Sequence, residues 1–470
     1  MINISRTIYK VFKSIMFVAL ALNIVSCAGM GSSGSVKIPP YRDVTLNNGL
    51  KVLIIEDHSL PYISAGLLIR TGSSHDPLGK SGLAEMTALV LDRGTKNYSA
   101  TELADKFGQL GTSFSADADY DYTYLSASGL SDNQDELLKL FFEVATRPAF
   151  SVSEVNRAKS EMIAEVKRGY DQPGYVAGRL YSQLLFGSHP YGRSPSGTVR
   201  DLQSIKQKDL IKGYLKNFRP NNAQLVLVGD LKPDIVKTLN ETLAEWKPRE
   251  NESDKLPSLM PINGVQVQLV NRPDLKQSEV RIGHYGVKRK NKDYQALLLA
   301  ETILGDGFTS RLMSEIRVKR GLTYGIRSSF DAREEVGPFT ISSNTRHEKV
   351  GELVTETLNV LKEFYDKGVT EQEVENAKGY LRGAFPRNIE TPDQMARMLL
   401  ALRFYGIEDD YMTDYIRNLN AISVSDVNKV IRKYYNPANL KVLIYAPKNK
   451  VIDQVRPIGA VEVKEYRELL

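Results

Sequence analysis

At 470 residues the chain is too long for a single compact core, and its length predicts two to four domains. With 42% hydrophobic and 25% charged residues it has the composition of an ordinary globular protein, which excludes a fibrous or low-complexity chain. The net charge of +6 falls to +3 without residues 1–26, which hold three basic and no acidic residues. A charge this small and dispersed argues against nucleic acid as a partner.

The N-terminus has the pattern of a secretory signal. Three basic residues precede an apolar run at 14–26 that is too short to span a bilayer comfortably. The run ends in Ile24-Val25-Ser26-Cys27, which resembles the lipobox of bacterial lipoproteins. The resemblance implies that residues 1–26 are a lipoprotein signal peptide and that Cys27 is lipidated. The chain would then be anchored to a membrane of the cell envelope, on the outer-membrane or periplasmic side if the cell is Gram-negative.

Cys27 is the sole cysteine, so an intramolecular disulfide is excluded. An alternative interpretation makes Cys27 a small buried residue of a membrane anchor. Its place at the end of the apolar run, and the glycine- and serine-rich residues after it, favour lipidation. Residues 27–40 are then expected to form a flexible tether.

Strand and helix patterns alternate after the tether. Residues 43–57 alternate apolar positions around Asn48-Gly49, which predicts a β-hairpin with a type I′ turn. Residues 135–145 and 353–365 carry apolar residues at helical spacing. This mixture predicts an α+β fold, in which mostly antiparallel sheets carry helices on one face.

The chain also repeats itself. Residues 202–228 resemble residues 419–445 at a constant offset of 217, and each segment reads as a helix, a proline and an apolar strand. Further upstream, Glu154, Val155, Ala158 and Lys159 match residues 219 positions later. We therefore expect two homologous domains in tandem. The expected parts are an N-terminal domain at 41–246, a polar linker at 247–261 and a C-terminal domain at 262–470.

Motifs in both copies resemble those of one peptidase family. They are found at 80–95, 164–200, 304–307, 310–312 and 317–324, and 185–192 (LFGSHPYG) is the most specific. Together they resemble the insulinase (pitrilysin) family, the inverzincins, closest to the branch of the mitochondrial processing peptidase and its bacterial two-subunit relatives. The resemblance covers residues 41–447 and implies that the two domains form half of a clam-shell chamber.

The zinc motif of that family is degenerate in this chain. The family reads Gly-Leu-Ala-His-x-x-Glu-His…Gly-Thr over fourteen residues, the same length as from Gly82 to Thr95. The two histidines then fall on Glu85 and Leu89, and the general base falls on Ala88. Glu165 matches the remaining glutamate ligand. Since a lone carboxylate cannot hold a catalytic zinc even with help from Glu85, we expect no metal and no catalytic residue in this chain.

The sequence offers two alternatives to a zinc site of the family type. The five histidines, none of which has another His or Cys within five positions, are His58, His75, His189, His284 and His347. Glu85 and Glu165 could instead form a carboxylate dyad, although a surface acid and a helix-capping acid are the simpler interpretations. Neither alternative predicts a zinc site.

The family also uses an arginine and a tyrosine from the second copy to hold the peptide near the scissile bond. Its spacing is Arg, six residues, Tyr, which Arg317 and Tyr324 match. A guanidinium and a phenol can donate hydrogen bonds to a peptide carbonyl and to a developing oxyanion. Arg320 is the rival arginine, and the basic residues could simply end a helix before Gly321.

These observations predict a non-catalytic, substrate-binding subunit of a heterodimeric zinc metalloendopeptidase of the cell envelope. The resemblance implies that a homologous partner supplies His-x-x-Glu-His and the zinc, and that extended peptides are the substrates. The alternative is a homodimeric or scaffold lipoprotein that binds peptides without cleaving them. A third hypothesis is an active metallopeptidase that uses an unrecognised site.

Overall fold

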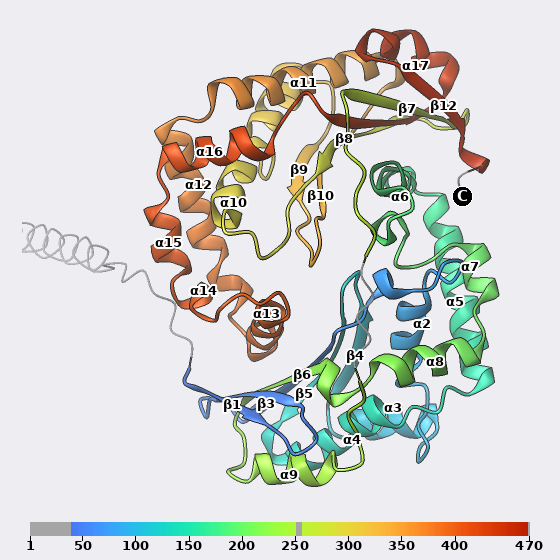
Figure 1. Cartoon of the computed structure of the whole chain (residues 1–470), viewed down its shortest axis with the longest axis vertical. Helices are drawn as coiled ribbons and strands as arrows, with labels where there is room; N and C mark the ends of the chain where they lie inside the picture. Colours follow the sequence, from blue (N-terminus) through green and yellow to red (C-terminus); the bar gives the residue numbers. More distant parts are fainter. Residues whose placement is uncertain (1–38, 251–255, 469–470) are drawn as a thin grey trace, which may run out of the picture.

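A computed structural model of the chain describes residues 39–250 and 256–468. The expected signal peptide, Cys27 and nearly all of the expected tether lie outside the described residues, as does part of the expected linker. Within the described ranges no helix combines the length and the apolar character needed to cross a bilayer. The two halves of the chain lie one above the other in Figure 1.

Six strands of the N-terminal half form one sheet in the order β1-β2-β6-β3-β5-β4. All neighbouring pairs are antiparallel except β2 and β6. The strands are β1 (Tyr41–Thr45), β2 (Lys51–Glu56), β3 (Tyr62–Ile69), β4 (Ser113–Ala118), β5 (Thr123–Leu130) and β6 (Ala223–Gly229).

The predicted hairpin is present as β1 and β2, but its turn is longer than a type I′ turn. Leu46 and Leu50 are joined by a backbone hydrogen bond of 2.9 Å, which leaves three loop residues rather than two. Gly49 has a φ of 85°, the left-handed conformation that the last residue of a three-residue loop commonly adopts. The prediction of a two-residue turn was therefore wrong, because Asn48-Gly49 occupies the end of a longer loop.

The C-terminal half forms a second six-stranded sheet in the order β12-β7-β11-β8-β10-β9. Here β7 is parallel to both β11 and β12, and the other pairs are antiparallel. The strands are β7 (Val265–Asn271), β8 (Ser278–Tyr285), β9 (Ile326–Phe330), β10 (Pro338–Thr345), β11 (Leu440–Ala446) and β12 (Val461–Glu465).

Helices surround both sheets (Figure 1). Those of the N-terminal half are α2 (Leu83–Val90), α3 (Ala100–Gln109), α4 (Gln134–Thr146), α5 (Val152–Tyr170), α6 (Pro173–Phe186), α7 (Val199–Ser204), α8 (Gln207–Asn217) and α9 (Ile235–Thr242). Those of the C-terminal half are α10 (Tyr294–Leu304), the π-helix η5 (Met313–Lys319), α11 (Val350–Lys367), α12 (Glu371–Ala384), α13 (Pro392–Phe404), α14 (Asp410–Thr413), α15 (Tyr415–Ala421), α16 (Val424–Tyr434) and α17 (Lys448–Val455). The helices predicted at 135–145 and 353–365 are α4 and α11.

The repeat seen in the sequence is a repeat of structure. Helices α8 and α16 begin and end 217 residues apart, and so do strands β6 and β11. Helices α5 and α12 begin 219 residues apart, as do α6 and α13. The predicted fold class, two homologous α+β units with mostly antiparallel sheets, is confirmed.

Each half also lends one helix to the sheet of the other. Helix α13 of the C-terminal half packs on β3 and β6, and helix α6 of the N-terminal half packs on the equivalent strands β8 and β11 (Figure 1). Along β6 the buried side chains alternate, so that Leu225 and Leu227 join the helices of their own half while Val226 and Val228 join the core that includes α13. Both faces of each sheet are therefore covered in part.

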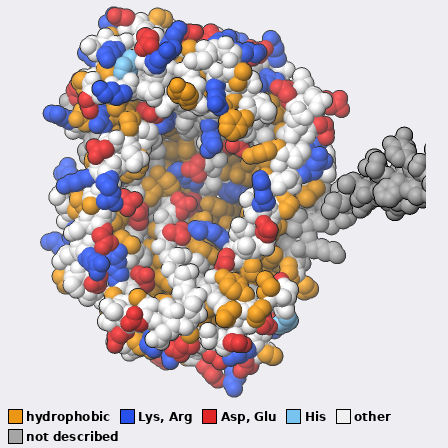
Figure 2. All heavy atoms as spheres, turned by 180° about the vertical axis from the view of Figure 1, so that it is seen from behind, with side chains coloured by type: hydrophobic (Ala, Val, Ile, Leu, Met, Phe, Trp, Pro, Cys, Tyr) orange, Lys and Arg blue, Asp and Glu red, His pale blue; other side chains and the backbone are white. Residues whose placement is uncertain are grey.

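The hairpin turns of the two halves also meet. The backbone N–H of Glu334, in the turn between β9 and β10, donates to the Asp121 carboxylate in the turn between β4 and β5, at 2.8 Å. The guanidinium of Arg333 lies 3.6 Å from the centre of the Tyr120 ring. Figure 2 shows the molecule hollowed between its two halves, with acidic, basic and hydrophobic side chains in the hollow.

Candidate functional site

Helix α2 carries the positions at which the resemblance places zinc chemistry. The buried carboxylate of Asp76 accepts hydrogen bonds from the backbone N–H groups at the start of this helix. The donors are Gly82, Leu83 and Ala84, at 2.9, 3.1 and 3.0 Å. Burial raises the pKa of Asp76 to about 7, and these N–H groups and the charge of Arg193 oppose the shift. With three hydrogen bonds to backbone N–H groups, the Asp76 side chain fixes the start of α2.

The structure places Glu85 and Glu165 close to one another. Glu85 lies in the first turn of α2, Glu165 lies on α5, and the two helices pack together. Burial raises the pKa of the Glu85 carboxyl, the hydroxyl of Ser196 lowers it, and the negative charge of Glu165 raises it further. The Glu165 side chain is 79% exposed and lies 4.0 Å from Arg168. The pair is thus one partly buried and one solvated carboxyl.

The other two motif positions offer no metal ligand. Ala88 is buried in the core of the N-terminal half, and Leu89 lies one helical turn after Glu85, on the same face. A methyl group and an isobutyl group can neither bind a cation nor accept a proton. A catalytic zinc needs three protein ligands and a water, so zinc does not fit the residues at this position.

The histidines lie elsewhere in the fold and have other partners. His58 pairs with Asp230 at 2.6 Å, His75 contacts the Ser74 hydroxyl at 3.1 Å, His189 accepts from the backbone N–H of Tyr191 at 3.1 Å, and His284 and His347 donate to backbone carbonyls at 2.7 and 3.0 Å. Across 39–250 and 256–468, no three His, Cys, Asp or Glu side chains are grouped as a metal ion would require.

Strand β4 forms an open edge of the N-terminal sheet beside α2. In the described sheet it pairs with β5 alone, so its other side presents backbone N–H and C=O groups outward. Its side chains alternate between exposed and half-buried. This edge has the form that an extended peptide needs in order to add as a further strand. Strand β9 is the equivalent edge of the C-terminal sheet.

Arg317 and Tyr324 lie at the surface of the C-terminal half, where Arg317 is half-buried and Tyr324 is exposed. Arg317 belongs to the π-helix η5, a rare, wide form of helix that is frequent at functional sites. Its guanidinium lies 5.6 Å from the centre of the Phe308 ring. Phe308 is 78% exposed and Tyr324 is 86% exposed. In the described part of the chain Arg317 has no ion-pair partner, so its charge is available to a ligand.

The rival arginine is already engaged. Arg320 forms ion pairs with Glu315 at 2.9 Å and with Glu356 at 2.8 Å. These two carboxylates hold its guanidinium against η5 and α11. The geometry therefore favours Arg317 over Arg320 as the arginine that meets a substrate.

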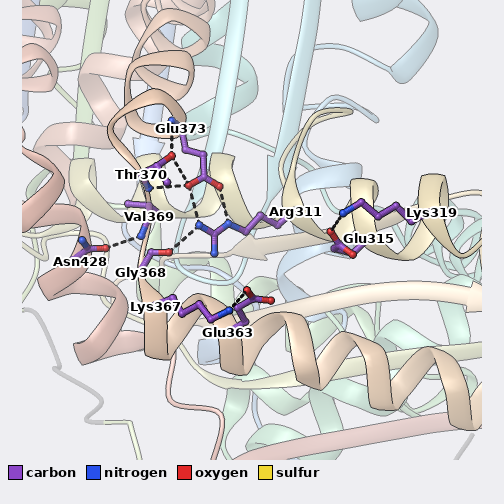
Figure 3. A network of polar contacts seen from close by, with 10 residues as sticks. All are labelled: Arg311, Glu315, Lys319, Glu363, Lys367, Gly368, Val369, Thr370, Glu373 and Asn428. Carbon is purple, nitrogen blue, oxygen red and sulfur yellow. Dashed lines mark hydrogen bonds and ion pairs between the residues drawn. The ribbon is translucent and has the colours of Figure 1, made fainter.

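A partly buried network anchors the segment that carries Arg317 (Figure 3). Arg311, just before η5, donates to both carboxylate oxygens of Glu373 on α12, at 2.7 and 2.8 Å, and to the carbonyl oxygen of Gly368 at 2.8 Å. Burial raises the pKa of Glu373, but the hydrogen bonds from Arg311 and Thr370 outweigh this and lower it to about 2. The carboxylate therefore stays charged, and the fork to Arg311 fixes where η5 begins.

Sequence reasoning did not single out two side chains of these sites. Phe308 beside Arg317 follows the glycine-rich turn at 305–307, and a large aromatic residue in such a turn is a signal that could have found it. Ser196 beside Glu85 had no such signal, because only the fold brings residue 196 to helix α2.

The fold and these sites define a duplicated α+β peptidase scaffold in which the zinc position has lost its ligands. Comparison with known proteins agrees. Residues 51–198 match the family described as Insulinase (Peptidase family M16), and residues 204–381 match the Peptidase M16 inactive domain. The chain belongs to the insulinase family, peptidase family M16.

Individual relatives include one that is named a non-peptidase homologue and one that is named a zinc protease. The chain is 29% identical over 418 residues to the Non-peptidase homolog YmxG of Helicobacter pylori, covering 86% of this chain and 94% of that protein. It is 24% identical over 440 residues to the Zinc protease PqqE of the same organism, covering 91% and 98%. A crystal structure of a peptidase M16 inactive domain from Pseudomonas fluorescens superposes with a TM-score of 0.81 and 29% identity, covering 87% of this chain and 98% of that one. The chain is thus similar to inactive members of the family.

Proposed function

We propose that the chain is the non-catalytic, substrate-binding subunit of a heterodimeric zinc metalloendopeptidase that degrades or processes peptides in the cell envelope. The observation that carries this proposal is a contrast between two sites. Helix α2 presents Glu85, Ala88 and Leu89 where a zinc would need ligands, whereas a half-buried Arg317 and an exposed Tyr324 follow an anchored segment. The similarity to inactive M16 domains supports it.

In this proposal the chain binds and orients an extended peptide. The guanidinium of Arg317, which has no ion-pair partner among the described residues, and the phenol of Tyr324 would donate hydrogen bonds to the peptide carbonyl and to the negative charge that develops on it. Phe308 and Tyr324 would cover the peptide with aromatic surface. The zinc and the general base belong to a homologous partner subunit. The presence in Helicobacter pylori of relatives named as a zinc protease and as a non-peptidase homologue is compatible with such a division of labour.

Attachment to a membrane through a lipid on Cys27 is part of the proposal and rests on the sequence pattern at 14–27. Mass spectrometry of the protein from a host that processes lipoproteins tests it. We expect a diacylated cysteine as the first residue, and Cys27→Ser should release the protein from the membrane fraction.

The central experiment combines this chain with its zinc-bearing homologue. The isolated chain should bind no stoichiometric zinc and cleave no peptide, and the pair should cleave peptides in a chelator-sensitive way. Arg317→Ala and Tyr324→Phe should each lower kcat/KM of the pair about tenfold or more, because each removes a hydrogen bond to the reacting carbonyl. Arg320→Ala is the matched control. If the pairs that contain the Arg317→Ala or Tyr324→Phe variant had the same kcat/KM as the unchanged pair, the assigned sites would be refuted.

The second candidate function is a scaffold or peptide-binding lipoprotein that acts without proteolysis. The relative named as a non-peptidase homologue favours it. It predicts that the chain is recovered from cells without a zinc-bearing relative, as a homodimer or with envelope proteins. Peptide binding by the isolated chain, measured by fluorescence anisotropy, would occur in both cases, so the copurified partner decides between them.

A further inference from the structure

A cavity of about 590 Å³ lies on the N-terminal half, away from α13 and η5. Helix α6, the loop at 187–198 and the loop at 78–81 form its walls. Three arginines line it, Arg179 from α6, Arg193 from the loop and Arg200 from the first turn of α7. None of the site residues described above lines this cavity, whereas part of the family-like segment at 164–200 does.

The two inner arginines are held by neutral groups only. Arg179 donates to the Tyr175 hydroxyl and to the carbonyl oxygen of Gly197, both at 2.8 Å. Arg193 donates to the carbonyl oxygen of Asp76 at 2.8 Å and to that of Ser74 at 3.4 Å. These bonds fix the two planar guanidinium groups in position without neutralising them. Each guanidinium has five N–H donors, so several remain for a ligand.

The positive charge in the cavity is not balanced. Arg200 is exposed, and none of the three arginines has an ion-pair partner within the described residues. Asp201 is the one acidic residue among the lining residues, so three positive charges face one negative charge. Burial lowers the pKa of the Arg193 guanidinium, and the charges of Asp76 and Asp201 only partly oppose this. An anion in the cavity would relieve that cost.

Two other cavities of the molecule show what a balanced lining looks like. In one, Arg403 pairs with Asp43 and Asp409. In the other, Arg42 pairs with Glu56, and the lining acids outnumber the lining bases. The α6 cavity thus differs from these two cavities in having arginines that no lining carboxylate pairs with.

The remaining lining supplies donors and apolar surface. The hydroxyls of Ser194 and Thr198 lie in the wall, and the Thr198 oxygen accepts from the Asp201 N–H, which leaves its own hydrogen free to donate. Leu78, which is 92% exposed, lines the cavity too, together with Leu180. The volume lies within the range typical of small-molecule sites, so there is room for more than a lone oxyanion.

We infer that this cavity binds a small organic phosphate: a phosphate group held by Arg179, Arg193 and Arg200, with an apolar part against Leu78. Guanidinium groups fit phosphate oxygens in a bidentate way, and hydroxyl donors complete the shell. The inference is independent of the proposed peptidase role, since it involves neither Arg317 nor Tyr324.

Isothermal titration of the full chain with phenyl phosphate tests the inference, and inorganic phosphate and benzoate are the comparison ligands at matched ionic strength. We expect saturable binding in the order phenyl phosphate, inorganic phosphate, benzoate. Arg200→Ala should weaken phenyl phosphate binding about tenfold, and Arg200→Lys should restore part of it, because lysine keeps the charge but not the fork. Arg200 makes no hydrogen bond in the described structure, so its removal should leave the melting temperature unchanged.

The matched control is Arg387→Ala, which removes an exposed arginine of the C-terminal half. Equal affinities of the Arg200→Ala and Arg387→Ala proteins would overturn the inference, and so would an absence of saturable binding. Benzoate binding as tight as that of phenyl phosphate would overturn the assignment to phosphate.

Discussion

The two halves of the molecule share one sheet topology but close its outer edge in different ways. In the N-terminal half the strand beside β2 is β1, which precedes it and runs antiparallel. In the C-terminal half the strand beside β7 is β12, which comes from the end of the chain and runs parallel. In both halves this strand is the outermost of the described sheet, opposite the open edges β4 and β9. The two halves thus share the position of the outer strand but not its direction or its place in the sequence.

The halves differ more in the side chains at their candidate sites. The N-terminal half keeps helix α2, fixed by Asp76, but lacks the ligand pair. The C-terminal half keeps the half-buried Arg317 and the exposed Tyr324 on a segment fixed by Arg311. The N-terminal half therefore has the fold without the zinc ligands. This is possible because the fold depends on many buried contacts, whereas a metal site depends on a few side chains.

The exchange of helices α6 and α13 gives the sharpest test of the equivalence of the halves. Leu180 on α6 and Leu399 on α13 lie 219 residues apart and are 2% and 0% exposed, each in a core formed with the other half. Leu180→Ala and Leu399→Ala should each lower the free energy of unfolding by about 2–5 kcal/mol. Urea unfolding followed by circular dichroism measures this.

Both variants should unfold in a single transition. The fluorescence of Trp246, the sole tryptophan, should change at the same urea concentration as the circular dichroism signal of the whole chain. If the two halves of the unchanged protein unfolded separately, the exchanged helices would not be what joins the halves.

The contact between the hairpin turns should contribute less. Arg333 of the C-terminal half is buried, lies 3.6 Å from the Tyr120 ring and 4.8 Å from the Tyr191 ring, and pairs with Asp331. Arg333→Ala should lower the free energy of unfolding by about 2 kcal/mol. Arg327→Ala, an exposed arginine of neighbouring β9, is the control and should have little effect on thermal unfolding.

Partly buried carboxyls on α2 and α10, Glu85 and Glu301, allow the halves to be compared through pH. Burial raises the pKa of Glu301 on α10 to about 8, with Asp306 adding to the shift and a hydrogen bond from Phe330 opposing it. Between pH 4.5 and 8 the folded chain keeps a proton that the unfolded chain releases, so this carboxyl reduces stability as pH rises. Glu301→Gln should therefore stabilise the protein at pH 8 by about 1–2 kcal/mol, and by far less at pH 5.

Glu85→Gln on α2 is the matched variant in the N-terminal half. Burial also raises the pKa of Glu85, but the shift is not of the size found at Glu301, so the same pH series should show a smaller gain. A gain at pH 5 equal to that at pH 8 would contradict the linkage for either residue.

The smallest predicted effect concerns the residue that immediately precedes each of the two equivalent helices, α8 and α16. Ser423 caps α16, accepting from the Asp426 N–H at 3.2 Å, while Asp426 accepts from the Ser423 N–H at 3.1 Å. Lys206 stands at the same place before α8 and has no acceptor in its side chain. Ser423→Ala should cost about 1 kcal/mol, and Lys206→Ser should gain about 0.5 kcal/mol, both measured by thermal unfolding. No gain from Lys206→Ser would show that the ends of the two helices are not equivalent.

Local patterns in the sequence predicted the repeat, the first hairpin and several helices, because apolar spacing and offset are properties of neighbouring residues. The exchange of α6 and α13 could not be predicted in this way. Their sequences show an apolar face but not which sheet it meets. The near-continuous apolar run at 225–228 was the available sign that both faces of β6 are covered.

For the sites, the sequence indicated Glu85, Glu165, Arg317 and Tyr324, and the resemblance supplied their roles. The sequence could not decide between Arg317 and Arg320. What separates them is the pair of ion pairs from Arg320 to Glu315 and Glu356, and Glu356 on α11 is brought to Arg320 only by the fold. The π-helical form of η5 and the arginine cavity beside α6 likewise depend on tertiary packing.

The crossed helices also set where motion can occur. A hinge between the halves would have to pull α6 off one sheet and α13 off the other at the same time, exposing two buried leucine-rich faces. The halves of this chain should therefore move as one rigid body. The width of the hollow between them is then set by the packing of these two helices and not by a flexible joint.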